Sequence, residues 1–317
     1  MYKVLIVQFY IYLILVLAGY ISSKIKIITS ENSSFLKDFI LKVTFPLLIF
    51  TTITHQPLNK DIFHNLIIVF GFSYLVMILL IGLGRFGSSI LKLEGESKKI
   101  HILHTVFGNV VFIGFPFIGA LFPDGSGIFY AAMFQLVSDS ILWTYGILYF
   151  RNNGKNNIKE IAKNLFNINT VVFLIALICW LFQFSLPLSI EKPFRDLGHS
   201  TLVLSLVYIG YILSTIDIEK TFKKVSIYVL TVNKMIIAPL IVLFIIMQFR
   251  HYFPWLNKAA ISAIILETGM PAMATIAILA KNYNSDFKLA SENILVTTVL
   301  SIFTLPLLWF LINLIYK

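Results

Sequence analysis

The sequence predicts an all-α integral membrane protein that crosses the bilayer about ten times. Two features of its composition carry this prediction. Hydrophobic residues make up 58% of the 317-residue chain and charged residues only 13%, against about 45–50% and about 25% in soluble domains. A soluble fold already exposes much apolar surface, so it could not hide this excess, whereas lipid tolerates it.

A transmembrane helix needs about 20 mostly apolar residues. Reading along the chain, we expect ten such segments, and none of the stretches between them is long enough for a separate soluble domain. They are residues 4–22, 36–55, 62–86, 99–122, 126–150, 168–186, 197–215, 222–248, 256–280 and 288–315. The first, from Val4 onward, lacks a small-residue cleavage pattern, so we interpret it as a span rather than a signal peptide.

The positive charges give an orientation. Of the 25 Lys and Arg residues, sixteen lie in the connections after the odd-numbered spans, seven lie on the other side with the termini, and two lie within spans. Cytoplasmic loops carry the excess of Lys and Arg. Both termini are therefore expected outside, and the net charge of +10 indicates membrane topology rather than nucleic-acid binding.

Spans four and nine differ from the other eight because helix-weakening residues interrupt them. Gly108, Gly114 and Pro116 lie in the fourth span, and Gly269 and Pro271 lie in the ninth. A break frees backbone N–H and C=O groups, which in a membrane must be satisfied by protein or by a water-lined cavity. We therefore expect two broken helices beside a site, although single Gly or Pro kinks are common in membrane helices.

Each broken span is the fourth in a run of five. This spacing is typical of an inverted repeat whose two halves cross at the breaks. The expected organisation is a first five-helix repeat over 1–151, a cytoplasmic connecting loop over 152–166, and a second repeat over 167–317.

The breaks also predict a chemistry. Half-helix N-termini present free N–H groups with partial positive charge, which attract an anion. Asn109, at the first break, adds an amide that can donate to a carboxylate. On this reasoning no formal positive charge is required. The single cysteine, Cys179, excludes a disulfide framework or a cysteine-based metal site, and we expect no metal and no cofactor.

Four segments resemble the auxin efflux carrier family, which includes bacterial transporters and the plant PIN-type carriers. They are Phe45–Phe50 (FPLLIF), Gly108–Pro116 (GNVVFIGFP), Gly269–Pro271 with the stretch up to Asn284, and Thr304–Pro306. The resemblance covers nearly the whole chain. The order and spacing of the four segments carry the resemblance, rather than any one motif.

The resemblance implies a ten-helix fold with a scaffold domain and a transport domain. It further implies elevator-like alternating access, carboxylate substrates at the crossing, and dimers formed through the scaffold domain. By position, Asn109 would meet the substrate carboxylate. The candidate substrate-binding residues are Gly108, Asn109, Pro116, Gly269, Met270 and Pro271. The chain lacks the long cytoplasmic loop of the plant members, so regulation through that loop is not carried over.

Ionisable residues inside spans are costly, at about 2.5–3.5 kcal/mol or more each, so each is a candidate for function. Asp139 and Lys234 could pair, either to hold helices together or as a proton relay. Glu267 precedes the second break, where it could couple a proton or cation or cap a half-helix. His104, three residues after His101, could sense pH or simply pack.

We expect a secondary carrier of a small organic anion, driven by a proton gradient or by the substrate's own gradient. One alternative is a sodium-coupled symporter of the bile-acid-transporter type, with a cation site at Glu267. Another is a membrane sensor that binds a ligand without moving it. No nucleotide-binding or hydrolase motif is present, so an enzyme is not expected. Richness in Ile, Lys and Asn indicates a low-GC bacterium and hence a cell-membrane location.

Overall fold

The computed structural model describes residues 2–150, 158–215 and 224–315. Their regular structure is helical, without a β-strand, and one isolated antiparallel bridge joins Gly108 to Ala272. The chain divides into two compact units, and each takes segments from both predicted repeats. The first unit comprises Met1–Ile62, Val111–Ala132 and Phe166–Ile216, and the second comprises Phe63–Val110, Met133–Leu165 and Asp217–Lys317.

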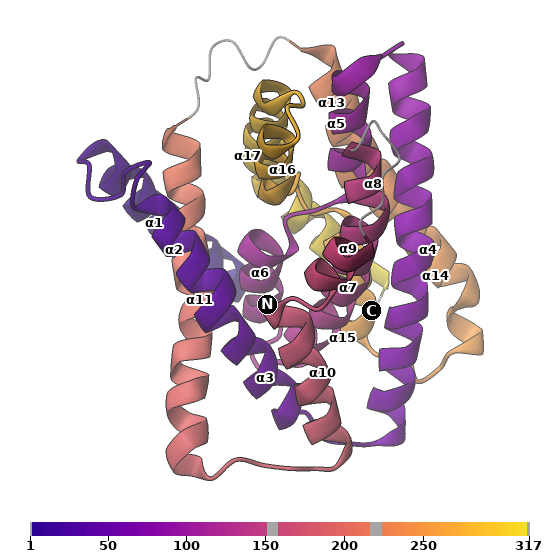
Figure 1. Cartoon of the computed structure of the whole chain (residues 1–317). Helices are drawn as coiled ribbons and strands as arrows, with labels where there is room; N and C mark the ends of the chain where they lie inside the picture. Colours follow the sequence, from indigo (N-terminus) through magenta and orange to yellow (C-terminus); the bar gives the residue numbers. More distant parts are fainter. Residues whose placement is uncertain (1, 151–157, 216–223, 316–317) are drawn as a thin grey trace. The chain divides into compact units, whose positions relative to one another are not determined.

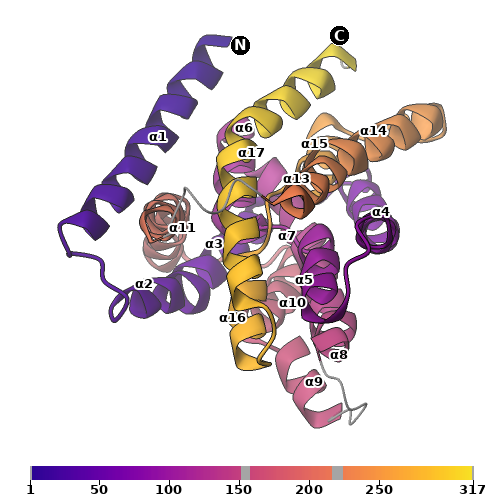
Figure 2. The same ribbon diagram turned by 90° about the horizontal axis from the view of Figure 1, so that it is seen from above.

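Six of the helices that the structure describes lie wholly in the first unit. They are α1 (Tyr2–Lys24), α2 (Ser33–Phe39), α3 (Phe45–His55), α6 (Phe115–Leu121), α10 (Ile168–Leu181) and α11 (Leu188–Ser214). The helices α1 and α11 lie side by side in both views (Figures 1 and 2). A Cβ added at Gly19 or Gly210 would overlap a backbone carbonyl of the facing helix. These two glycines therefore set how closely α1 and α11 approach.

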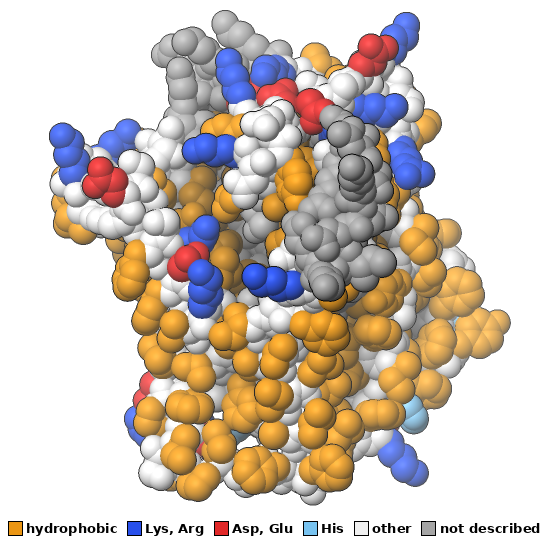
Figure 3. Space-filling model, viewed as in Figure 1, with side chains coloured by type: hydrophobic (Ala, Val, Ile, Leu, Met, Phe, Trp, Pro, Cys, Tyr) orange, Lys and Arg blue, Asp and Glu red, His pale blue; other side chains and the backbone are white. Residues whose placement is uncertain are grey.

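The rest of the first unit is built around α3. Gly198 of α11 packs on its backbone, where an added Cβ would lie 2.7 Å from the nitrogen of Leu48. On another side, the indole of Trp180 in α10 donates to the carbonyl of Gln56 at 2.9 Å. Over α3 and α10, apolar side chains dominate the surface (Figure 3). Several on α10 are largely exposed, including Ile175 and Ile178, as expected of a helix that faces lipid.

The second unit holds the remaining helices, except that α4 begins just before it and α7 enters it from the first unit. They are α4 (Lys60–Ile90), α5 (Gly95–Val106), α7 (Ser126–Ile141), α8 (Ile147–Phe150), α9 (Ile158–Leu165), α13 (Val225–Val232), α14 (Ala238–Phe249), α15 (Lys258–Thr268), α16 (Ala274–Asn282) and α17 (Phe287–Ile315). Within this unit α5 packs against α13, α16 and α17.

In the described part of the chain, four turns of π-helix adjoin these elements, at Ile40–Thr44, Val110–Gly114, Leu142–Gly146 and Asn233–Ile237. They join α2 to α3, lead into α6, join α7 to α8, and join α13 to α14. Each inserts an extra residue into a helix and so turns the side chains around it. Such insertions often accompany functional sites, and one of them positions Lys234.

Helices form in each of the ten segments predicted from the sequence, as far as the structure describes them. Four are long and apolar enough to cross a membrane by length and composition: α4, α11, the stretch Val225–Phe249, and α17. The described parts of three others are apolar but shorter. The chain is thus an all-helical protein with several candidate membrane spans.

Two details differ from the prediction. The helix α11 begins nine residues before the expected span, because its charged first turns are paired along the helix by Glu191 with Arg195 and Lys192 with Asp196. The second half of the expected connecting loop forms the helix α9. Residues 151–157 of that loop lie outside the described part of the chain.

Candidate functional site

The two predicted breaks are present and pair with each other within the second unit. The first separates α5 from the π-turn at Val110, and the second separates α15 from α16. The N–H of Asn109 donates to the carbonyl of Pro271 at 2.7 Å, and the N–H of Met273 donates to the carbonyl of Phe107 at 3.1 Å. The broken backbones therefore satisfy each other, as unpaired groups in an apolar interior must be satisfied.

Close approach at this crossing depends on glycine. A Cβ at Gly108 would lie 2.9 Å from the Cβ of Met270 and 3.4 Å from the Met270 carbonyl oxygen. A further N–H of the second break, that of Ala272, donates to the hydroxyl of Thr297 in α17 at 3.0 Å. This hydrogen bond connects the second break to α17.

Lys234 caps the end of the first half-helix. Its ammonium donates to the carbonyls of Thr105 at 3.0 Å and Val106 at 3.3 Å, and the residue is fully buried. These are carbonyls that a helix leaves unpaired at its C-terminus, where a cation is favoured. A lysine from the distant π-turn therefore lies at the first break, in addition to the partial charges of the helix ends expected there.

Glu267 lies at the end of α15, beside the second break, and is 1% exposed. Neither of its carboxylate oxygens accepts a hydrogen bond from a residue that the structure describes. The Lys234 ammonium and the Glu267 carboxylate interact electrostatically. The crossing thus holds one buried cation and one buried acidic group contributed by two different helices.

The partner of Asp139 is not Lys234, the residue considered from the sequence. It accepts a hydrogen bond from the amide of Gln135, one turn earlier in α7, at 2.8 Å. Among the described residues no salt bridge joins it to Lys234. The two residues therefore belong to separate polar groups of the second unit.

The two histidines of α5 are both buried. The Nδ1 atom of His104 lies 3.1 Å from the amide nitrogen of Asn293 in α17. The ring of His101 faces α4, where a Cβ at Gly87 would lie 3.0 Å from its Nε2 atom. His104 thus links the first half-helix to α17.

The predicted substrate-binding residues divide between the units. Gly108, Asn109, Gly269, Met270 and Pro271 lie together at the crossing in the second unit, and the side chain of Asn109 is buried. Pro116 lies in the first unit, where its carbonyl accepts a hydrogen bond from the hydroxyl of Tyr12. The structure brings five of the six residues together within one unit.

Sequence reasoning missed the supporting residues on α17. Asn293 and Thr297 are four residues apart and contact the two broken helices, one through His104 and the other through the backbone of Ala272. The available signal was a polar stripe within an apolar span, because residues at i and i+4 share a helix face. Such a stripe shows that a face meets polar groups, but not which groups.

Comparison with known proteins identifies a family of membrane transport proteins. A family model described as "Membrane transport protein" matches residues 4–309. An uncharacterized transporter of Methanocaldococcus jannaschii is 27% identical over 319 residues, covering 96% of this chain and 97% of its own. An uncharacterized transporter of Methanothermobacter thermautotrophicus is 25% identical over 306 residues, covering 93% and 94%. The chain therefore belongs to the membrane transport protein family, that of the auxin efflux carriers which its motifs resemble.

Proposed function

We propose that this protein is a secondary carrier of a small organic anion, such as a carboxylate, which binds at the crossing of the two broken helices. The observation that carries the proposal is the Lys234 ammonium at the break between α5 and the π-turn. It places a basic side chain where polar backbone is already concentrated. No side chain caps the N-terminus of α16, so this half-helix end can also favour an anion. The Asn109 amide would donate to the carboxylate.

We further propose alternating access of the elevator type, with the second unit carrying the bound anion. The division of the chain into two compact units supports this, as does the gathering of five of the six predicted binding residues in one of them. The proposal includes ten membrane spans as a 5+5 inverted repeat, both termini outside, a cell-membrane location and homodimers.

Proton coupling is favoured over sodium coupling at this crossing. A sodium ion is held by oxygen ligands, among which freed backbone carbonyls are typical at broken helices. Here the carbonyls of Thr105 and Val106 already bind the Lys234 ammonium. Glu267, His104 and Asp139 remain the candidate groups for moving a proton.

Flux measurements in proteoliposomes test the proposal. Labelled mono- and dicarboxylates would be offered to wild type, to Asn109→Ala and to Asn282→Ala, whose asparagine is exposed at the end of α16. We expect wild type and Asn282→Ala to transport the same acid and Asn109→Ala to lose most of this flux. Unchanged flux in Asn109→Ala would refute its assigned role.

Two further arms separate the alternatives. Transport that continues when choline replaces sodium supports the proposal, whereas strict sodium dependence would favour the bile-acid-transporter type. Saturable binding of an acid with no flux, under either a pH gradient or a substrate gradient, would indicate a sensor and overturn the carrier assignment.

A further inference from the structure

Asp139 is an acidic side chain inside an apolar helix that has no cation beside it in the described part of the chain. It lies near the middle of the predicted span 126–150, in the part of α7 that belongs to the second unit. Its hydrogen-bond partner among these residues is the Gln135 amide, at 2.8 Å. No described charged side chain forms a salt bridge with it or acts on it electrostatically. A negative charge on Asp139 would therefore be uncompensated.

Two other buried acidic groups of the second unit show the contrast. Glu292 of α17 forms an ion pair with Lys224. Glu267 interacts electrostatically with Lys234, which lies on a different helix. In both cases a basic side chain balances the carboxylate, so the carboxylate does not need a proton to become neutral overall.

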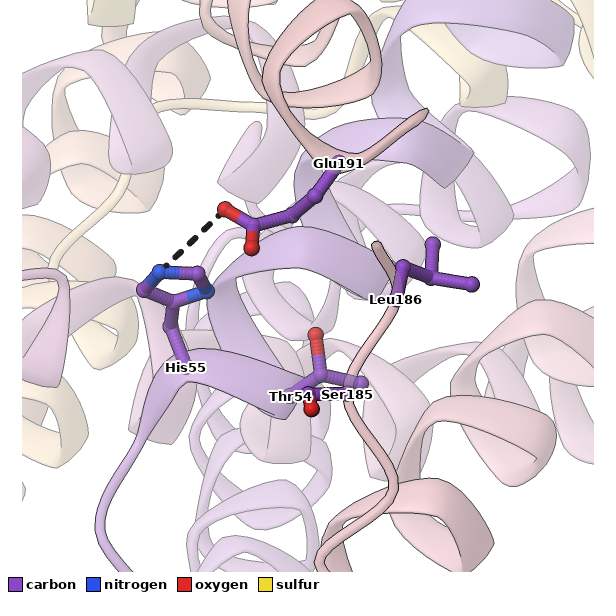
Figure 4. A pocket seen from close by; sticks show the side chains of 5 residues that line it. All are labelled: Thr54, His55, Ser185, Leu186 and Glu191. Atoms are coloured by element: carbon purple, nitrogen blue, oxygen red, sulfur yellow. Dashed lines mark ion pairs between the residues drawn. The ribbon is translucent and has the colours of Figure 1, made fainter. Parts of the chain in front are cut away.

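Glu191, at the start of α11 in the first unit, is balanced in the same way. Figure 4 shows its carboxylate and the His55 ring pointing toward each other across a small cavity. The Nε2 atom of His55 lies 3.4 Å from a Glu191 oxygen, and a guanidinium nitrogen of Arg195 lies 3.5 Å from the same oxygen. Arginine keeps its charge in proteins, so Glu191 has a permanent positive neighbour, unlike Asp139.

An ionised carboxylate without a cation is costly in an apolar span, and such a group ordinarily becomes neutral by binding a proton. The step is simple: the carboxylate takes a proton from a hydronium ion and leaves a carboxylic acid and a water molecule. Acidic residues within spans often form proton pathways for this reason. We infer that Asp139 is the site that binds the proton which accompanies the transported anion.

The side chains next to Asp139 can hold both protonation states. The Gln135 nitrogen donates to the carboxylate, while the Gln135 Oε1 atom is buried and accepts no hydrogen bond from a described residue. Half a turn of the amide exchanges these two atoms, so its oxygen can accept from a protonated Asp139. The hydroxyl of Ser138, also buried and without a described partner, can donate or accept. The amide and the hydroxyl thus suit both the carboxylate and the acid.

The described contacts place two other ionisable side chains beside this part of the chain. The hydroxyl of Tyr74 in α4 is hydrogen-bonded to that of Ser140 at 3.1 Å. The guanidinium of Arg85, also in α4, lies 6.0 Å from the centre of the Tyr145 ring, in the π-turn that follows α7. Neither group contacts Asp139, so neither takes the place of a proton.

This inference rests on the proposed carrier function and specifies its coupling. Asp139 belongs to the same unit as five of the six predicted binding residues. If that unit carries the anion, it carries the proton with it. A monocarboxylate and one proton together have no net charge. Net accumulation of a monocarboxylate should therefore follow the pH gradient and not the membrane potential.

The proton can be tested without a ligand, by infrared spectroscopy of the purified full chain in lipid nanodiscs. The C=O stretch of protonated carboxyl groups, identified by its shift in D₂O, would be followed from acid to alkaline pH. The variants are Asp139→Asn, Gln135→Leu and Glu267→Gln. The matched control is Asp61→Asn, whose aspartate is exposed in the first turn of α4. Thermal unfolding checks that each variant is folded, and Asp139→Ser replaces Asp139→Asn if that variant is not.

We expect wild type, Glu267→Gln and Asp61→Asn to share a protonated-carboxyl band that Asp139→Asn lacks. Gln135→Leu should keep this band at a shifted frequency, because the hydrogen bond to the amide is lost. An unchanged spectrum in Asp139→Asn at every pH would overturn the inference. Loss of the band when sodium replaces choline at constant pH would also overturn it, because it would indicate a sodium site.

A flux measurement tests the coupling itself. Proteoliposomes would be loaded with potassium and valinomycin to set the membrane potential, offered labelled monocarboxylates under a pH gradient, and compared with protein-free liposomes. Asp139→Asn should lose accumulation driven by the pH gradient but retain exchange of labelled for unlabelled acid. Accumulation equal to that of wild type would overturn the inference and leave the carrier proposal intact. Absence of flux of every acid in wild type would refute the carrier proposal, while the infrared band would still decide whether Asp139 binds a proton.

Discussion

The buried lysine at the crossing gives the sharpest stability prediction. In Lys234→Met the two hydrogen bonds from the ammonium to Thr105 and Val106 are lost, and Glu267 loses its neighbouring cation. Hydrogen bonds from charged groups contribute about 1.5–3 kcal/mol each, so the two together contribute about 3–6 kcal/mol. These contributions are already net of the loss of hydration, so we take the lower end of the range. We expect a net loss of about 3 kcal/mol in the free energy of unfolding.

The chain supplies a matched control. Lys42 also lies in a π-turn, but its side chain is 64% exposed and pairs with Asp38 at 2.7 Å. Exposed pairs of this kind contribute about 0–1 kcal/mol. Lys42→Met should therefore change the free energy of unfolding by less than about 1 kcal/mol.

Both variants would be unfolded by denaturant titration in mixed micelles and followed by tryptophan fluorescence. Lys234→Met leaves the acidic side chain of Glu267 buried without a neighbouring cation, which is costly. The double variant Lys234→Met with Glu267→Gln removes that acidic group and should therefore recover part of the loss. Equal losses for Lys234→Met and Lys42→Met would refute the capping role of Lys234.

Three further predictions use the same unfolding measurement. Gly108→Ala places a Cβ 2.9 Å from that of Met270 and should cost about 1–3 kcal/mol. In the control Gly71→Ala the added Cβ meets nothing within 4 Å, so this variant should be more stable by about 0.5–1 kcal/mol. Equal effects of the two substitutions would contradict the close crossing. Thr297→Val removes the acceptor of a buried N–H in the second break and should cost about 1–3 kcal/mol, and a neutral result would show that α17 does not hold the break. Gly210→Ala overlaps a backbone carbonyl of α1 and should cost more than Gly71→Ala gains, and a stabilised variant would exclude tight packing of α1 on α11.

The helices and the breaks were predictable because their signals are local. Apolar length marks a span, and Gly269 with Pro271 marks an interruption wherever the chain lies in space. The register of the crossing was not predictable. That Asn109 pairs with Pro271, rather than with a neighbour, depends on how two distant segments dock.

The partner of Lys234 could not be predicted for the same reason. Its position in an apolar span showed that it is buried and needs a partner, and Asp139 was the acidic residue considered. The structure satisfies it instead with the carbonyls freed by the first break. The sequence contained the two halves of this interaction, the break and the buried cation, but not their proximity.

The start of α11 shows a helix that begins earlier than local reasoning from the sequence predicts. The predicted span begins at residue 197, after a stretch that contains four charged residues and Pro193. Yet Glu191 with Arg195, and Lys192 with Asp196, are four residues apart and form pairs along a helix. Pro193 lies inside the helix, which continues through it.

Ligand binding to the isolated protein tests the anion site at the crossing most directly. A panel of carboxylic acids would be screened by thermal unfolding of wild type, of Asn109→Ala and of Asn282→Ala. A true ligand at 100 times its dissociation constant stabilises the folded state by about 2.7 kcal/mol, with a shift that grows with concentration. The account predicts this shift for an acid with wild type and Asn282→Ala and its loss in Asn109→Ala. The same concentration-dependent shift in all three proteins would contradict it.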